Sequence, residues 1–330
     1  MKVLITGGTG FIGSRLALRC RELGWQVTVL GREDAGQPEV ENRVFLESNG
    51  IEIIAGSVTD RERMFEISRG MQVVFHLAAA QHEMNIPDEH FRAVNVEGTR
   101  NMLDASVESK VGRFIHGSTI GVYDRDDANS VDELTKLRPS NIYGITKAEG
   151  EKVVKTYFSR LPCVIVRISE TYGPGDRRLL KLFRAINKGV FFMIGNGENV
   201  HQLVFVDDLV DGLISAADCP AAPGEVLLLA GQDQSTSNEM VEAVANALDV
   251  RAKFWRAPLW PFMFLATILE YSLRPLGLQP PLHRRRMDFF TKSFRISTRK
   301  ASEILGFSAR TNFAAGARKT AVWYKDNGLL

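Results

Sequence analysis

Residues 1–13 read MKVLITGGTGFIG, and this stretch decides the fold of the chain. The apolar run at 2–6 predicts a short buried strand, and residues 14–23 predict a helix after the glycines. A glycine-rich turn between a strand and a helix suits a phosphate group, because the free amides and the dipole of the helix both point at the turn. Such turns also occur without a ligand, so the motif alone is a weak signal of a nucleotide site.

The glycines of this turn have a meaningful spacing, since Gly7, Gly10 and Gly13 lie three residues apart. In a dinucleotide site the first glycine permits a tight turn and the second lets a pyrophosphate approach the backbone. The third lets the helix pack closely on the strand. The spacing therefore predicts the phosphate-binding turn of a dinucleotide fold.

The composition of the 330-residue chain is that of an ordinary globular protein, with 45% hydrophobic and 24% charged residues. A net charge of +2 creates no field that would attract nucleic acid. Cys20, Cys163 and Cys219 are scattered, which favours a reducing compartment over a zinc site or a disulfide framework. The first residues lack the features of a signal peptide, and no apolar run has the length of a membrane span. We therefore expect a cytoplasmic protein with no metal site and no nucleic-acid partner.

Short β-branched runs alternate with longer helical patterns through the first half of the chain. The sequence predicts strands at 2–6, 26–30, 51–54, 72–77, 113–116 and 164–167, and helices at 11–23, 61–68, 89–109 and 143–160. This alternation is typical of βαβ units and predicts an α/β fold, a doubly wound parallel sheet of the Rossmann type. Ligands of such sheets bind at the carboxyl ends of the strands.

The pattern becomes irregular after Gly173-Pro174-Gly175. Helices are predicted at 179–188, 207–217, 238–248, 298–305 and 314–325, and a strand at 224–229. We expect a dinucleotide-binding domain over 1–172 and a smaller, mixed α/β substrate-binding region over 173–330, intergrown with the first.

Tyr143 and Lys147 lie four residues apart in a predicted helix and therefore share one face of it. A free tyrosine has a pKa near ~10, and a neighbouring ammonium favours the phenolate and lowers that pKa. The pair could therefore move a proton to or from an alcohol or a carbonyl. An ordinary surface pair has the same spacing, so the motif needs support from elsewhere in the chain.

Two adjacent hydroxyls, Ser118 and Thr119, follow the strand predicted at 113–116. Adjacent side chains of an extended segment point to opposite sides, so only one of them is expected to meet Tyr143. The alternative is a loop hydroxyl that binds its own backbone.

These motifs together resemble the extended short-chain dehydrogenases/reductases, the NAD-dependent epimerase/dehydratase family, with the 3β-hydroxysteroid dehydrogenase-like branch as one option. The resemblance covers nearly the whole chain, and the motifs occur in the order typical of the family. They are Thr6–Gly13, His76–Ala79, Asn95–Thr99, Ser118–Tyr123, Tyr143–Lys147, Arg167–Asp176, Val206–Leu209 and Trp323–Gly328.

The resemblance implies roles for individual residues. Tyr143 would be the acid/base, Lys147 would hold the nicotinamide ribose and tune Tyr143, and Thr119 would hydrogen-bond the reacting oxygen with Ser118 close by. Tyr123 would be structural, and Asn95 would support the site. The other cofactor-binding positions would be Gly7, Thr9, Gly10, Phe11, Ile12, Gly13, Arg32, Ser57, Val58, Leu77, Ala78 and Ala79.

The end of the second predicted strand bears on the choice between NADP and NAD. An acidic residue there would bind the ribose 2′-hydroxyl of NAD, whereas this chain has Gly31 followed by Arg32. A guanidinium binds a 2′-phosphate well, so we favour NADP over NAD. The alternative is that Arg32 stacks on adenine or faces solvent. Ser57 stands where the family usually has an aspartate, so the adenine contact could pass to Val58.

The substrate positions implied by the resemblance are His82, Glu170, Arg177 and His201. Nucleotide-sugar members usually carry an Asn and an Arg where this chain has Glu170 and His201. A carboxylate would repel a diphosphate and a neutral imidazole replaces a bidentate guanidinium weakly. Arg177, Arg178 or Lys181 could replace that charge, so a nucleotide sugar is put in doubt but not excluded.

The stretch 258–286 is strongly apolar at its start and basic at its end. Three interpretations stay open. It could form a core or dimer helix, a lid over an apolar substrate, or a helix on a membrane surface with Arg284–Arg286 facing anionic lipid.

These observations favour an NAD(P)-dependent enzyme that interconverts a secondary alcohol and a ketone on an apolar, steroid-like or lipid-like small molecule. The alternative is a nucleotide-sugar epimerase or dehydratase that keeps its NAD(P) bound. A non-catalytic NADP-sensing regulator is disfavoured, because the chain keeps both Tyr143 and Lys147. By analogy with the family, the helices at 89–109 and 143–160 suggest a homodimer.

Overall fold

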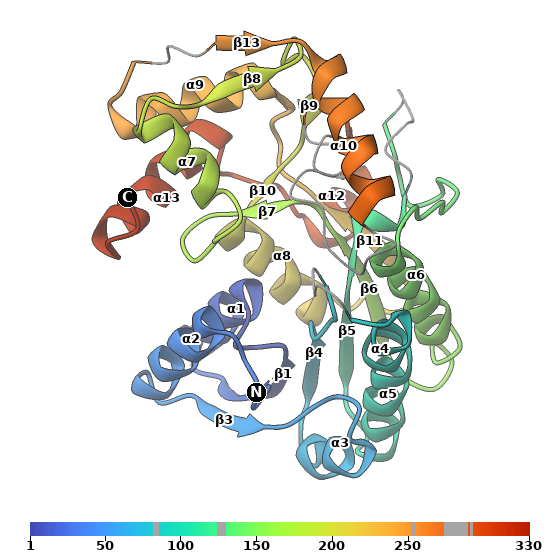
Figure 1. Ribbon diagram of the computed structural model, residues 1–330. Helices are drawn as coiled ribbons and strands as arrows, with labels where there is room; N and C mark the ends of the chain where they lie inside the picture. The colour runs from blue at the N-terminus through green and yellow to red at the C-terminus, as the bar shows by residue number, and fades with distance from the viewer. Residues whose placement is uncertain (82–85, 124–129, 252–254, 274–289, 291–292) are drawn as a thin grey trace.

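The computed structural model describes residues 1–81, 86–123, 130–251, 255–273, 290 and 293–330 (Figure 1). Its strands are β1 Lys2–Thr6, β2 Gln26–Gly31, β3 Glu52–Ala55, β4 Val73–His76, β5 Arg113–Thr119, β6 Cys163–Ile168, β7 Thr171–Tyr172, β8 Phe192–Ile194, β9 Val200–His201, β10 Val204–Phe205, β11 Val226–Leu229, β12 Ser235–Thr236 and β13 Trp255–Ala257. Its helices are α1 Phe11–Glu22, α2 Gln37–Ser48, α3 Arg61–Ser68, α4 Asp88–Arg92, η1 Ala93–Glu97, α5 Gly98–Glu108, η2 Ile120–Val122, α6 Ile142–Lys155, α7 Leu180–Asn187, α8 Val206–Asp218, α9 Ser237–Leu248, α10 Leu259–Leu273, α12 Arg299–Leu305 and α13 Phe313–Asp326.

The centre of the molecule is a seven-stranded sheet in the order β11-β6-β5-β4-β1-β2-β3. All its neighbouring strands pair in parallel, which confirms the predicted doubly wound Rossmann architecture. The order reverses at β1, which has β2 on one side and β4 on the other. The crevice at such a reversal is the usual ligand site of this architecture.

Both faces of the sheet are buried, so its strands are apolar on both sides. In β1, Val3 and Ile5 belong to one hydrophobic cluster, which the helices α1 and α8 also line. Leu4 points to the opposite cluster, lined by α3, α5 and α6. Figure 1 shows these helices on the two sides of the sheet.

Two helices differ from the sequence-based expectation. The predicted helix at 89–109 is continuous but changes pitch, because the π-helical turn η1 separates α4 from α5. Helix α2 was not predicted, and its weak signal has a physical cause, since Leu46 is its one fully buried side chain. An exposed helix needs no apolar stripe, so periodicity does not reveal it.

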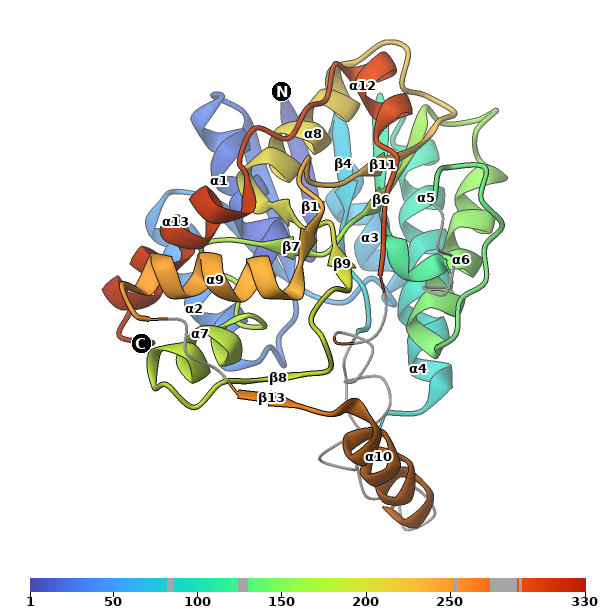
Figure 2. The same ribbon diagram turned by 90° about the horizontal axis from the view of Figure 1, so that it is seen from above.

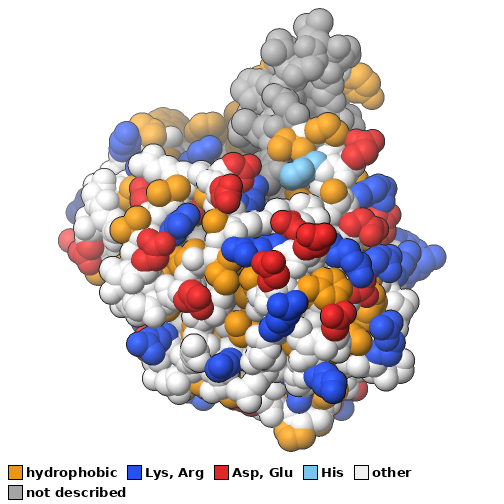
Figure 3. Space-filling view, turned by 90° about the horizontal axis from the view of Figure 1, so that it is seen from below, with side chains coloured by type: hydrophobic (Ala, Val, Ile, Leu, Met, Phe, Trp, Pro, Cys, Tyr) orange, Lys and Arg blue, Asp and Glu red, His pale blue; other side chains and the backbone are white. Residues whose placement is uncertain are grey.

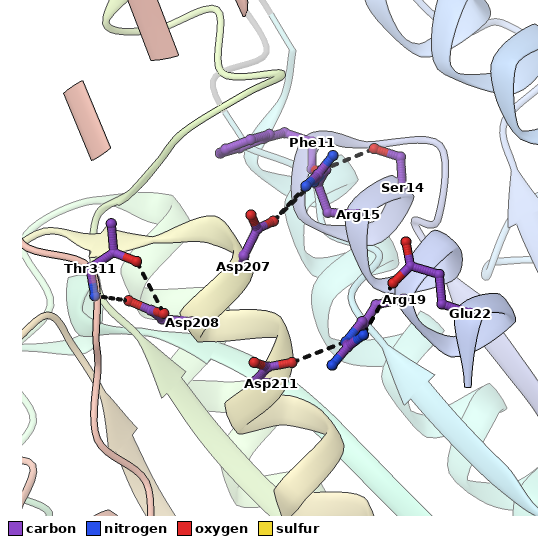
Figure 4. Close-up of polar contacts among 9 residues, drawn as sticks. All are labelled: Phe11, Ser14, Arg15, Arg19, Glu22, Asp207, Asp208, Asp211 and Thr311. Atoms are coloured by element: carbon purple, nitrogen blue, oxygen red, sulfur yellow. Dashed lines mark hydrogen bonds and ion pairs between the residues drawn. The ribbon is translucent and has the colours of Figure 1, made fainter. Parts of the chain in front are cut away.

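The part of the chain after Gly173 is interwoven with the central sheet. Strand β11 is the edge strand beside β6, and α8 packs on α1. Figure 4 shows two ion pairs between these helices, Arg15 with Asp207 at 2.6 Å and Arg19 with Asp211 at 3.2 Å. The rest of this part forms a second core among α7, α9 and α13 with two-stranded ladders beside it. A domain boundary at 172/173 stays a prediction.

A buried ion pair fixes α6 on the sheet. Arg167 in β6 and Glu151 in α6 have side chains that are 2% and 1% exposed. The guanidinium donates two parallel hydrogen bonds, from Nε to Oε1 at 2.9 Å and from Nη2 to Oε2 at 2.7 Å. Ser118 donates to Oε1 at 2.6 Å, and Arg167 also donates to the hydroxyl of Tyr123. These partners satisfy both charges, which a buried pair requires.

We predict that Arg167→Met lowers the free energy of unfolding by roughly 3–5 kcal/mol, because Glu151 is left charged and buried without its partner. The double variant Arg167→Met/Glu151→Leu should recover most of that loss. Urea unfolding of the single and double variants measures both effects. Arg19→Met is the control, since its partly exposed ion pairs should contribute less than ~1 kcal/mol. Equal losses in the single and double Arg167 variants would contradict the prediction.

Candidate functional site

The glycine turn after β1 is packed so closely that a side chain at Gly7 or Gly13 would clash with backbone atoms. Gly7 has a φ of +67°, and a Cβ there would lie 2.8 Å from the backbone nitrogen of Ala78. A Cβ on Gly13 would lie 2.3 Å from the carbonyl oxygen of Gly7. Helix α1 starts behind this turn with no capping side chain at Gly10 and no acidic residue in its first turn. The turn therefore leaves the helix start open to an anion, and a dinucleotide pyrophosphate fits it.

The loop that carries Thr9 is held from two sides. Asn42 of α2 donates its side-chain amide to the carbonyl oxygen of Thr9 at 2.9 Å. A Cβ on Gly31 would lie 2.7 Å from the Cγ2 atom of Thr9, so the end of β2 needs a glycine at this position. The acidic residue typical of NAD sites would not fit there unless Thr9 moved.

Arg32 follows directly and extends from the end of β2. Its guanidinium lies 3.9 Å from Asp34 and 3.8 Å from Glu39 in partly exposed ion pairs. These distances are longer than direct hydrogen bonds, so each of these two ion pairs is weak.

The two predicted adenine positions, Ser57 and Val58, differ in exposure. The Ser57 hydroxyl hydrogen-bonds Thr59 at 2.7 Å. Val58 is 3% exposed, and its carbonyl accepts the Asn101 side-chain amide at 3.0 Å. The Val58 side chain is therefore closed to an adenine, whereas the Ser57 side chain is partly exposed.

Residues after β4 line the opposite side of the glycine turn. The backbone N–H of Ala78 donates to the Thr6 hydroxyl at 3.2 Å, and Ala78 lies against Gly7. The Leu77 side chain extends to Gly117 on β5, and Ala79 is half-buried. His82 lies outside the described residues.

Asn95 fastens this segment to α6. Its side chain accepts the N–H of Ala80 at 2.8 Å and donates to the Ala80 carbonyl at 3.1 Å and to the Thr146 hydroxyl at 2.9 Å. It lies in the π-helical turn η1, a feature frequent at functional sites. The predicted supporting role of Asn95 therefore has a structural basis in these contacts.

Thr119 and Tyr143 both lie next to Gly121. The Thr119 hydroxyl accepts the N–H of Gly121 at 3.0 Å. A Cβ on Gly121 would lie 3.4 Å from Thr119 Oγ1 and 3.9 Å from Tyr143 Cε1. The next residue of α6, Gly144, packs so closely that its Cβ would lie 2.2 Å from the Gly121 carbonyl oxygen. Asn141 caps the helix by accepting the Gly144 N–H at 3.0 Å, which fixes the start of α6.

Ser118 points away from this group. Its hydroxyl donates to the buried carboxylate of Glu151, while Thr119 faces Gly121. The two adjacent hydroxyls therefore diverge as the strand geometry predicts, and the structure places Ser118 in the ion-pair cluster.

Lys147 lies one turn below Tyr143 and is only 1% exposed. Burial lowers its pKa to about 8, and the carboxylate of Glu151 opposes that shift. The histidines facing it, His76 and His116, are fully buried, and burial lowers the pKa of His76 to about 3 and that of His116 well below its usual value. Both histidines are therefore neutral at pH 7, whereas most Lys147 side chains carry their charge.

Two of the predicted substrate residues lie together. His201 Nδ1 is 3.9 Å from Glu170 Oε2, and the imidazole is buried among Asn199 and Ser237. Arg177 instead binds Glu41 of α2 at 2.6 Å and lies over the ring of Trp323. Arg177 thus has a structural role between α2 and the C-terminal helix.

The sequence reasoning missed Glu151, Asn141 and Asn42. Glu151 had a usable signal, because it continues the four-residue spacing of Tyr143 and Lys147 along one helix face. The Asn141 cap was also readable as an Asn before a helix. Asn42 had none, since α2 was not predicted.

An open glycine turn beside Thr119, Tyr143 and Lys147 defines an enzyme of the short-chain dehydrogenase/reductase class. Comparison with known families agrees, since the model of the "NAD dependent epimerase/dehydratase family" matches residues 3–230. The chain belongs to this family, which confirms the resemblance seen in the sequence.

The chain is similar to proteins with several different activities. One is a 3beta-hydroxysteroid-dehydrogenase/decarboxylase (isoform 2) of Arabidopsis thaliana, 27% identical over 96% of this chain and 61% of the relative. Another is a UDP-glucose 4-epimerase of Vibrio cholerae, 27% identical over 97% of this chain and 94% of the relative. The crystal structure of UDP-glucuronic acid 4-epimerase from Bacillus cereus in complex with NAD has a TM-score of 0.79 at 23% identity, with 99% of each chain covered. At this sequence identity the structural likeness shows the fold alone.

We predict a pH-dependent effect of Lys147→Met on stability. The unfolded lysine has a pKa near ~10.4, so between pH 8 and that value the unfolded state binds more protons than the folded state. Wild-type stability should therefore rise with pH in this window, and the variant should lack the rise. At pH 7 the variant should be more stable by up to ~3 kcal/mol, an advantage that shrinks towards pH ~10.4.

Urea unfolding of wild type and Lys147→Met at pH 7 and at pH ~10.4 measures this difference. Lys155→Met, at the exposed end of α6, is the matched control and should show no such pH dependence. A stability difference between wild type and Lys147→Met that stays constant with pH would contradict the prediction.

Proposed function

We propose that this enzyme interconverts a secondary alcohol and a ketone by transfer of a hydride between substrate and a nicotinamide dinucleotide. The observation that carries the proposal is the convergence of Thr119 and Tyr143 at Gly121, with Lys147 buried one turn below. All three lie at the carboxyl end of β5 or on the helix packed against it, beside the strand-order reversal where such ligands bind.

The nicotinamide would supply or accept the hydride, and the chain's own residues would move the proton. In the direction of reduction, the carbonyl carbon gains the hydride and the oxygen takes the hydroxyl proton of Tyr143, which leaves a phenolate. The Thr119 hydroxyl would hydrogen-bond the same oxygen. The Lys147 ammonium stabilises the phenolate by its charge, and it would bind the ribose of the cofactor.

We propose an apolar rather than a nucleotide-diphosphate substrate. At the two positions implied for diphosphate recognition the chain has Glu170 and a buried, hydrogen-bonded His201. The nearby cation Arg177 is held by Glu41, and Arg178 is held by Asp176. A diphosphate that bound either of these two arginines would have to replace its carboxylate partner.

A nucleotide-sugar epimerase or dehydratase is the second candidate function. It is supported by relatives along the full chain, such as the UDP-glucose 4-epimerase of Vibrio cholerae. This activity would oxidise and reduce the same substrate with no net consumption of cofactor. A panel of ketones, alcohols and UDP-sugars, assayed by NADPH absorbance and by product analysis, separates the two. A homodimer through α5 and α6 stays a proposal.

The proposed cofactor is NADP rather than NAD. The proposal rests on Gly31, where an acidic side chain would have to displace Thr9, and on the guanidinium of Arg32, which follows directly. A 2′-phosphate would be a stronger partner for that guanidinium than the two partly exposed carboxylates.

Tyr143→Phe should keep cofactor affinity and lose turnover by roughly a hundredfold or more, because the variant removes the proton donor and little volume. Steady-state rates and cofactor titration by protein fluorescence measure the two effects. Tyr157→Phe removes a hydroxyl bound to Asp104 at 2.7 Å and serves as the control, which should retain activity. Wild-type turnover in Tyr143→Phe would remove this residue from the mechanism.

NADPH should bind more tightly than NADH, and Arg32→Ala should abolish the difference by weakening NADPH alone. We expect roughly a tenfold preference, as for one charge-assisted contact of about 1.5 kcal/mol. Calorimetric titration of both cofactors tests it. Arg43→Ala is the matched control, with side-chain exposure of 41% against 44% for Arg32. Equal affinities of wild-type protein for the two cofactors would overturn the assignment.

A further inference from the structure

Helix α10 presents a stripe of large apolar side chains to solvent. Trp260, Phe264, Ile268 and Tyr271 are 73%, 65%, 44% and 76% exposed. Their spacing of four, four and three residues places them on one face of the helix. This set, Trp260, Phe264, Ile268 and Tyr271, is called the apolar stripe below. A row of exposed aromatic and aliphatic side chains indicates a surface that contacts a protein, a ligand or a membrane.

The opposite face of α10 is already used. Ala266 is fully buried, and Leu259, Phe262 and Met263 pack in a small cluster with Ile194 of β8. The ring of Phe262 also lies 5.7 Å from that of Phe192. The stripe therefore does not belong to the core, and Figure 2 shows α10 standing out from the body of the molecule.

Exposed aromatic side chains are concentrated at this end of the protein. Among the exposed large apolar side chains of the described residues, Trp255 is 85% and Phe192 43% exposed, beside α10 on strands β13 and β8. By contrast, the face in Figure 3 mixes acidic and basic side chains with scattered apolar ones. The concentration therefore marks one place on the molecule.

The length of α10 suits contact with a bilayer surface, not a crossing of the bilayer. Its 15 residues span about 22 Å, whereas a hydrocarbon core is ~30 Å thick. Among the described residues there is no helix with the length and apolar character of a membrane span. Tryptophan and tyrosine favour the headgroup boundary, where their rings are apolar and their N–H and O–H groups remain hydrated.

The charge of the segment around α10 distinguishes between a second copy of the chain and a lipid surface as the partner of the apolar stripe. Residues 251–295 contain nine lysines and arginines against two acidic residues, although the whole chain has a net charge of +2. The rest of the chain is therefore net acidic. Two copies meeting through this segment would bring like charges together, whereas an anionic lipid surface would attract it. Among the described residues of this segment, Arg256 is exposed on β13, the strand that directly precedes α10.

We propose that α10 docks this enzyme on an anionic membrane surface, with the apolar stripe inserted at the boundary of headgroups and acyl chains. Figure 1 shows α10 beyond one end of the sheet, on the side away from the N-terminus. The glycine turn follows β1 at this same end of the sheet. Docking would thus hold the catalytic side of the molecule toward the lipid. The remainder of the chain, which is net acidic by sequence, would be repelled by the anionic surface.

The test is co-sedimentation of the full chain with vesicles of phosphatidylcholine alone or mixed equally with phosphatidylglycerol. Wild-type protein should bind the anionic vesicles at least tenfold more tightly than the neutral ones, and added salt should weaken that binding. The variant Trp260→Ser/Phe264→Ser/Tyr271→Ser should lose at least tenfold in affinity for anionic vesicles, because three inserted side chains are removed.

The control variant Val40→Ser/Val44→Ser/Phe45→Ser removes three side chains on α2 that are 46%, 61% and 53% exposed, and it should bind like wild type. Circular dichroism and NADPH titration confirm that each variant is folded, and they keep this test independent of turnover. No binding of wild-type protein to anionic vesicles, equal binding to neutral ones, or equal loss in both triple variants would overturn the proposal. So would a solution mass that halves in the stripe variant, which would identify a second copy as the occupant.

Discussion

The bidentate ion pair between Glu151 and Arg167 is the contact on which the geometry of the site depends. It joins α6 to β6 in a place where neither charge reaches water, so the helix has one favourable position on the sheet. Lys147 and Tyr143 lie one and two turns above Glu151 on the same helix face. The pair thus sets where the ammonium and the phenol lie. It also supplies the negative charge that keeps a buried lysine mostly protonated at neutral pH.

Close backbone contacts do the remaining positioning. Gly144 rests on the carbonyl of Gly121, and Gly13 rests on that of Gly7, at distances that exclude any side chain. The first contact brings Tyr143 to Thr119, and the second shapes the turn that would receive the pyrophosphate. Both contacts are possible because glycine has no Cβ, so backbone packs directly on backbone in the site. Glu170 and His201, by contrast, are placed by side-chain contacts, with 3.9 Å between Glu170 Oε2 and His201 Nδ1.

The sequence predicted the fold because apolar runs such as Val3–Ile5 must be buried on both sides of a parallel sheet. Helix spacing predicted that Tyr143 and Lys147 share one face of a helix, whereas the choice of Thr119 over Ser118 and the roles of these residues rest on the family resemblance. Helix α2 escaped prediction because it buries a single residue fully. The orientation of Ser118 toward Glu151 depends on a contact across 33 residues, which no local pattern encodes. The same limit applies to the stripe of α10, because periodicity reports an apolar helix but not which face the body leaves uncovered.

A crystal structure of the full chain with NADPH would test the central claim most directly, since it requires no knowledge of the substrate. The account predicts that the pyrophosphate contacts the backbone amides of Phe11 to Gly13. It also predicts that the nicotinamide ribose hydrogen-bonds Lys147, with the nicotinamide ring beside Tyr143. A dinucleotide bound away from the glycine turn, or one whose nicotinamide lies out of reach of Tyr143, would contradict the account.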